Sequence, residues 1–270
     1  MKRLLVVANE TVGGAALIDA VKRHADQGDV HVTVICPQNQ PKGGWVIYDD
    51  AARGAAENRL ETTLAQLREI GIEANGEIMD PDPYAATIDA IHAFGADEII
   101  ISTHPDARSG WMRKDLPARI QDDSGLPVEH VVVDLDAERA DIVHTLVVAN
   151  QTVGSDPLHE RLVQKNAEGR HRFTVVVPAS GGTGDPHERL AQLLKRLSDE
   201  GIQAVGQVGH PDPFTAIQNA MQFYAVDEIV ISTFEGERSG WLRANLIERV
   251  EAATSKPVEH VVGTREKVGG

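Results

Sequence analysis

The stretch PDPYAATIDAIHAFGADEIIISTHPDARSGW (Pro81–Trp111) decides the fold, because the chain contains it twice. The second copy, PDPFTAIQNAMQFYAVDEIVISTFEGERSGW (Pro211–Trp241), lies 130 residues further on, and no gap interrupts the match. At the same spacing, the string PVEHVV recurs at Pro127–Val132 and Pro257–Val262. Self-similarity of this length and order predicts two copies of one domain in tandem.

The front halves of the copies also match, but at a different spacing. LVVANETVG begins at Leu5 and LVVANQTVG begins at Leu146, an offset of 141 residues. The first copy therefore carries about 11 extra residues, which we place at Pro41–Ala51 and interpret as a longer surface loop. The predicted domains are residues 1–135 and 143–265, separated near the polar segment DLDAERADI at 134–142.

Short β-branched runs alternate with helical patterns in each copy, which is typical of an open parallel sheet with helices on both faces. The predicted strands of the first copy are Leu4–Ala8, His31–Cys36, Glu73–Ile78, Glu98–Ser102 and Val128–Val133. A helix over 52–70 is expected to stop at Gly71, and the next to start with Asp82 as its N-cap. Asp212 repeats that start signal in the second copy. The predicted fold class is α/β, with two tandem five-stranded parallel sheets.

Composition excludes several classes of function. The 270 residues have a formal net charge of -15 and a sequence pI near 5.1, so nucleic acid is not an expected partner. Cys36 is the only cysteine, which excludes an internal disulfide framework and favours a cytoplasmic location. The start MKRLLVVANE is too short in apolar residues for a signal peptide and is interpreted as a first strand, and no membrane contact is expected.

The carboxyl ends of the strands are where an open parallel sheet binds ligands, especially where the strand order reverses. The candidate ligand-binding residues are Asn9, Thr11, Ser102, Thr103, Arg108, Ser109 and Gly110 in the first copy, and Asn150, Thr152, Ser232, Thr233, Gly236, Arg238, Ser239 and Gly240 in the second. Small residues beside a fixed arginine suit an anionic small molecule. In the alternative interpretation, the arginines pair with local acids and the Ser-Gly steps only form turns.

The chain resembles the universal stress protein (UspA-like) family over nearly its whole length. The resemblance rests on DPDPYAATIDAIHAFGADEIIIS and HPDPFTAIQNAMQFYAVDEIVIS, each followed by RSGW and PVEHVV. It implies an adenine-nucleotide alpha-hydrolase-like sheet with strand order 3-2-1-4-5, a role in the stress response, and AMP or ATP as the candidate ligand. It also implies pairing through the fifth strands, as an internal pseudo-dimer of the two domains or as a homodimer.

Departures from the family pattern fall on the phosphate-binding loop. The family's first loop glycine corresponds to Ser102 and Ser232, and its last Gly-Ser/Thr pair corresponds to Pro117–Ala118 and Ile247–Glu248. Proline has no N–H to donate, and Glu248 would repel a phosphate. Asp115 and Asn245 are further expected to cap these helix starts with their side chains. We therefore expect a degraded ATP cradle, with any nucleotide either smaller or held through Arg108 and Arg238.

The sequence favours a binding protein over an enzyme. It has no nucleophile elbow, Walker loop or GxGxxG motif, and its histidines form no metal-ligand motif. His130 and His260 are expected to be half-buried and hydrogen-bonded, and Trp111 and Trp241 to pack their loops onto the sheet. The leading hypothesis is a small-ligand sensor or adaptor with no turnover of its own and no metal. The alternatives are a nucleotide hydrolase that uses the same crevice and a pure protein-interaction module.

Overall fold

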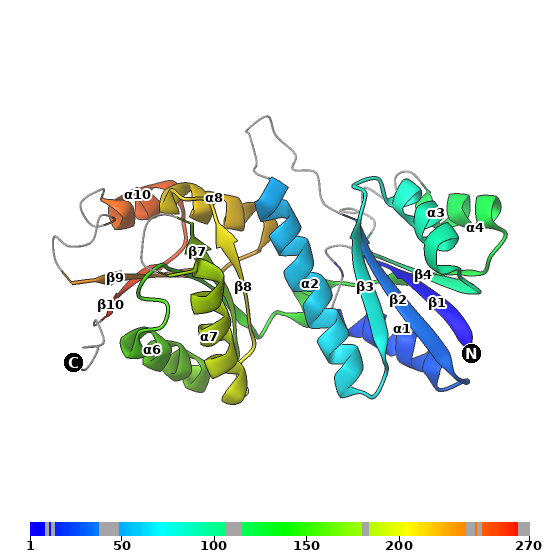
Figure 1. The fold of residues 1–270 in the computed structure, drawn as a ribbon, viewed down its shortest axis with the longest axis horizontal. Coiled ribbons are helices and arrows are strands. Elements are labelled where there is room, and N and C mark those ends of the chain that lie inside the picture. Colours follow the sequence, from blue (N-terminus) through cyan, green and yellow to red (C-terminus); the bar gives the residue numbers. More distant parts are fainter. Residues whose placement is uncertain are drawn as a thin grey trace. The chain divides into compact units, whose positions relative to one another are not determined.

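The computed structural model describes residues 1–8, 11, 14–37, 49–105, 115–179, 184–235, 241 and 245–263 (Figure 1). The chain divides into two compact units, one of residues 1–43 and 56–140, the other of residues 44–55 and 141–270. Each unit contains one sheet and is described by itself.

The first unit is built on a parallel sheet of five strands. They are β1 (Lys2–Val7), β2 (Val30–Pro37), β3 (Ala74–Met79), β4 (Glu98–Thr103) and β5 (Val128–Val132). Their order in the sheet is β3-β2-β1-β4-β5, so the order reverses between β1 and β4. All pairs are parallel, as in Val6 opposite Ile100. The five predicted strands are confirmed, with ends that differ by at most two residues.

The second unit repeats this architecture. Its strands are β6 (Val143–Ala149), β7 (His171–Pro178), β8 (Ala204–Gly209), β9 (Glu228–Phe234) and β10 (Val258–Gly263). Their order is β8-β7-β6-β9-β10, again parallel throughout and with its reversal between β6 and β9. The predicted fold class, including the 3-2-1-4-5 order, is therefore confirmed in both copies.

Helices cover both faces of each sheet (Figure 1). In the first unit, α1 (Ala15–Ala25) and α2 (Asp49–Glu69) pack on one face, and α3 (Pro83–Phe94) and α4 (Leu116–Ser124) on the other. The second unit has α6 (Asp156–Glu168) and α7 (Pro186–Asp199) on one face, and α8 (Pro213–Phe223) and α10 (Leu246–Ala253) on the other. Burial on both faces explains why the central strands are almost continuous runs of Val, Ile and Leu.

The predicted helix signals are found where polar side chains can satisfy free backbone amides. The Asp82 carboxylate accepts hydrogen bonds from the amides of Tyr84 and Ala85, and Asp212 accepts one from Thr215. Gly71, which follows α2, has a φ of 81°, a left-handed conformation that favours glycine. These local rules placed the helix ends correctly.

Two expectations need correction. Asp115 and Asn245 do precede α4 and α10, but both adopt a left-handed backbone with φ 49°, and neither side chain caps its helix. A capping side chain reaches the first-turn amides from an extended backbone, which these residues lack. Of the predicted loop at Pro41–Ala51, residues 49–51 belong to α2, while 41–48 lie outside the described residues.

Candidate functional site

A buried threonine lies at the point where each sheet reverses its order. The Thr11 hydroxyl donates to the Ser102 carbonyl oxygen at 3.2 Å, and the Thr152 hydroxyl donates to the Ser232 carbonyl oxygen at 3.0 Å. Ser102 is in β4 and Ser232 in β9, so the same bond ties the loop after the first strand to the fourth strand in both units. The structure therefore brings these four predicted residues together at the reversal point.

The hydroxyl groups of Ser102 and Ser232 are the unusual feature of this edge. Both serines are 1% exposed, and neither Oγ has a hydrogen-bond partner within the described part of the chain. A buried hydroxyl without a partner costs about 1–3 kcal/mol relative to one that is satisfied. That the same cost recurs at equivalent positions in both copies indicates a group kept available for a ligand or a bound water.

Thr103 and Thr233, the next residues along these strands, each bind a histidine of the neighbouring strand. The Thr103 Oγ1 lies 2.7 Å from His130 Nε2, and the Thr233 Oγ1 lies 2.8 Å from His260 Nε2. Burial lowers the pKa of His260, so its ring is neutral at pH 7. The prediction of half-buried, hydrogen-bonded histidines is confirmed.

An arginine that sequence reasoning missed reaches this edge in the second unit. From the first turn of α7, Arg189 donates to the Asn150 side-chain oxygen at 2.8 Å and to the Gly184 carbonyl at 2.9 Å. Arg59 occupies the equivalent position on α2. It lies beside Cys36 at the end of β2, where burial raises the pKa of the thiol and Arg59 acts in the opposite direction. The repeated arginine, 130 residues apart, was a signal visible in the sequence.

The start of α1 is capped from a distant part of the first unit. The amides of Ala15 and Ala16 donate to the two carboxylate oxygens of Glu138 at 2.8 and 3.4 Å. Glu138 ends the short helix α5 (Leu135–Glu138), which follows β5. Because Gly14 has no side chain to cap α1, this carboxylate satisfies the first-turn amides and complements the helix dipole.

The two units fill the space beside this helix start in different ways. A side chain at Gly14 would collide with Val133, whereas the equivalent residues in the second unit are Ser155 and Gly263. A Cβ at Gly263 would in turn lie 2.9 Å from the Ser155 hydroxyl. Each unit therefore pairs one glycine with one larger residue, in opposite arrangement. The Ser155 Oγ is also buried and has no hydrogen-bond partner among the described residues.

The remaining predicted site residues lie outside the described residues. These are Asn9, Arg108, Ser109 and Gly110 in the first copy, and Gly236, Arg238, Ser239 and Gly240 in the second. Trp111 is also outside them, while Trp241 is partly buried against the core beneath α8 and α10, as predicted. Cys36 is buried and unoxidised.

Searches of the described residues for other kinds of site were negative. No group of three or more His, Cys, Asp or Glu residues in the described ranges could hold a metal ion. None of the described helices is both long enough and apolar enough to span a membrane.

No family model and no curated protein sequence matches this chain. Among solved structures, it is similar to a universal stress protein from Archaeoglobus fulgidus, at 18% identity and a TM-score of 0.37, covering 98% of each chain. A putative universal stress protein from Pseudomonas aeruginosa is 17% identical, with a TM-score of 0.31 and coverage of 97% of this chain and 94% of that one. HepE from Anabaena, solved with UDP and glucose, is 11% identical, with a TM-score of 0.30 and coverage of 96% and 80%. Similarity at this level does not assign a ligand.

Proposed function

We propose that this chain is a tandem universal stress protein that binds a small anionic ligand at the carboxyl edge of its sheets and acts as a sensor or adaptor. The family assignment is supported by the ordered motifs found twice in the sequence and by the strand order of both sheets. AMP and ATP are the candidate ligands. The proposed location is the cytoplasm, and no catalytic step is part of the proposal.

The observation that carries the proposal is the pair of unsatisfied serine hydroxyls at the reversal point. Ser102 and Ser232 are buried, equivalent and without partners among the described residues, at the edge where open parallel sheets bind ligands. A ligand oxygen or nitrogen that reaches these hydroxyls would recover the lost hydrogen bonds. The proposed site also includes the loop arginines, Arg108 and Arg238, which would supply positive charge to an anionic group.

The proposed ligand site departs from a complete phosphate cradle. Pro117 lies in the first turn of α4, and Glu248 lies in the first turn of α10. The first residue removes an amide donor and the second adds negative charge where a helix start would otherwise attract phosphate. We therefore expect AMP to bind at least as tightly as ATP.

Calorimetric titration of nucleotide-stripped protein with ATP, ADP, AMP and cyclic AMP tests the proposal. We expect heat of binding with at least one nucleotide, reduced several-fold in affinity by Ser102→Ala, Ser232→Ala, Arg108→Ala or Arg238→Ala. Ser198→Ala, at an exposed position near the end of α7, is the control for a serine away from this edge. Absence of binding to all four nucleotides, or binding that none of the site variants weakens, would contradict the proposed site.

For partners, we propose that the chain pairs through β5 and β10, the terminal strands of the two sheets. Val132 and Val262 expose 47% and 43% of their surface on these strands. Edge strands with exposed apolar residues favour pairing with another strand. The pairing could join the two domains as a pseudo-dimer or two chains as a homodimer. Val132→Lys and Val262→Lys, examined by light scattering and by chemical cross-linking with peptide mapping, test both arrangements.

A further inference from the structure

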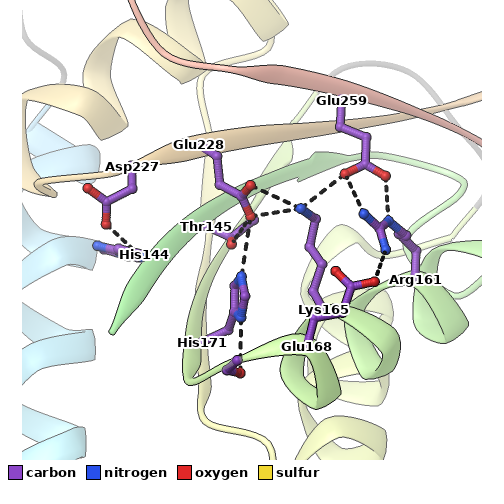
Figure 2. Close-up of polar contacts among 10 residues, drawn as sticks. His144, Thr145, Arg161, Lys165, Glu168, His171, Asp227, Glu228 and Glu259 are labelled. Carbon is purple, nitrogen blue, oxygen red and sulfur yellow. Dashed lines mark hydrogen bonds and ion pairs between the residues drawn. The ribbon is translucent and has the colours of Figure 1, made fainter. Parts of the chain in front are cut away.

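The opposite edge of each sheet, where the strands begin, carries a cluster of charged residues. In the second unit, Lys165 of α6 is 5% exposed, and its Nζ lies 2.9 Å from Glu228 and 3.0 Å from Glu259 (Figure 2). Figure 2 shows that Arg161 of the same helix also binds Glu259. The ammonium group thus joins the end of α6 to the beginnings of β9 and β10.

The first unit has the same pair of carboxylates but a different base. Glu98 and Glu129 are equivalent to Glu228 and Glu259, while His24 of α1 stands where Lys165 stands in the second unit. His24 is 9% exposed. Its Nε2 lies 2.7 Å from Glu129 Oε2, and its Nδ1 lies 3.3 Å from Glu98 Oε2.

This geometry suits a histidine ring that carries two protons. An imidazolium donates from both nitrogens and can therefore satisfy a carboxylate on each side. In a neutral ring, one nitrogen is an acceptor, and its lone pair would face a carboxylate oxygen. Lysine keeps its charge far above neutral pH, whereas an ordinary imidazole loses its proton at about pH 6.5. The two units therefore differ in whether the buried base can titrate near neutrality.

Other charged groups around His24 do not substitute for it. Lys2 of β1 pairs with Glu98, and Arg23 of α1 lies 2.6 Å from Glu129. These two side chains are 45% and 58% exposed, so water screens their contribution. In the second unit, Glu228 also accepts a hydrogen bond from Thr145 at 2.6 Å and faces His171 at 3.7 Å. Leucine replaces that threonine at the equivalent position of the first unit, so Glu98 depends more on its buried base.

We propose that the first unit is proton-sensitive through His24, which fastens the end of α1 to β4 and β5 when doubly protonated, whereas Lys165 fastens α6 independently of pH. Deprotonation would leave Glu98 facing a ring lone pair and would weaken the attachment of α1. The chain would thus combine one repeat that responds to neutral or alkaline conditions with one that does not. This proposal rests on geometry at the amino edge and does not depend on the proposed ligand site.

The carboxylates are held in their charged form in both units. Burial raises the pKa of Glu129, but hydrogen bonds from His24 and Arg23 outweigh it, and the net shift is downward. Burial likewise lowers the pKa of Lys165, but its bonds to Glu228 and Glu259 outweigh it, and the net shift is upward. The acids therefore remain ionised where imidazole titrates, so His24 is the group that changes charge between about pH 5.5 and 8.

Hydrogen–deuterium exchange of the full chain tests the proposal without separating the units. Peptides from α1 and α6 are compared in the same sample at pH 5.5 and pH 8, after correction for the intrinsic exchange rate at each pH. Stabilisation by the protonated ring is present at the lower pH and lost as the pH rises. We expect the protection of α1, relative to that of α6, to fall about tenfold over this range.

Two exchanges between the repeats provide matched variants. His24→Lys should make the ratio of α1 to α6 protection constant with pH, and Lys165→His should give α6 a pH dependence like that of α1. A constant ratio in the unmodified chain would overturn the proposal without any variant. A pH dependence that persists in His24→Lys would also overturn it, because another group would then be responsible.

Discussion

Val133 occupies the space that a side chain at Gly14 would need. Replacing Gly14 by serine, the residue at the equivalent position of the second unit, should therefore destabilise the first unit by about 1–3 kcal/mol through overpacking. Urea unfolding measures the loss. Adding Val133→Gly recreates the Ser155–Gly263 pair and should recover most of the stability, whereas additive losses in the double variant would show that the two sites are independent.

Removing the unsatisfied hydroxyls should have opposite effects on stability and binding. Ser102→Ala and Ser232→Ala remove buried groups that lack partners, so the ligand-free protein should be as stable as the original or up to about 1 kcal/mol more stable. Thermal unfolding without ligand measures this effect. A loss above 1 kcal/mol would mean that these hydroxyls already have structural partners, such as tightly held water. Ser198→Ala serves again as the control.

The carboxylate of Glu138 should contribute measurably to α1. Glu138→Gln removes the charge that faces the amides of Ala15 and Ala16 and should cost about 0.5–1 kcal/mol, while Glu138→Ala should cost about 1–2 kcal/mol. Exchange protection of the first turn of α1 reports the effect locally. Glu61→Gln, at an exposed position on α2, is the matched control. Equal protection in Glu138→Ala and the unmodified chain would show that α1 does not depend on this cap.

Asp97 should titrate well below an ordinary aspartate. Hydrogen bonds from the side chain and the backbone of Arg3 lower its pKa to about 2. A lowered pKa means that its contribution to stability is present above the usual aspartate range, near pH 4, and is lost as the pH falls toward 2. Arg3→Ala should move the titration back toward pH 4, as followed by NMR of the carboxyl carbon. Asp227 is the internal comparison, because His144 replaces Arg3 there and donates to it through its backbone amide.

The sheets and most helices could be predicted because their signals are local or repeated. Runs such as Leu4–Ala8 are long enough to mark buried strands, and Asp82 followed by proline marks a helix start. The duplication then doubled each observation. The left-handed backbone of Asp115 and Asn245 was missed because the same residue types also occur at ordinary N-caps, and the sequence does not distinguish the two conformations.

The candidate site was only partly predictable. Thr11 and Ser102 could be named because each follows a strand that ends at the reversal point. Arg189 was missed because it lies on a helix, not in a strand-end loop, and its reach depends on side-chain direction. The contacts of His24 with Glu98 and Glu129 were missed for a related reason: they join residues 74 or more positions apart, and neither the helix nor the strand pattern indicates them.

The cap on α1 has a consequence for dissecting the protein. The matching segments suggested a first domain that ends at residue 135, but Glu138 lies beyond that point and satisfies amides at Ala15 and Ala16. A fragment cut at residue 135 would begin its first helix with those amides bare. The duplicated sequence and the self-sufficient folding piece therefore have different ends, and an excised first half should extend at least through Ala140.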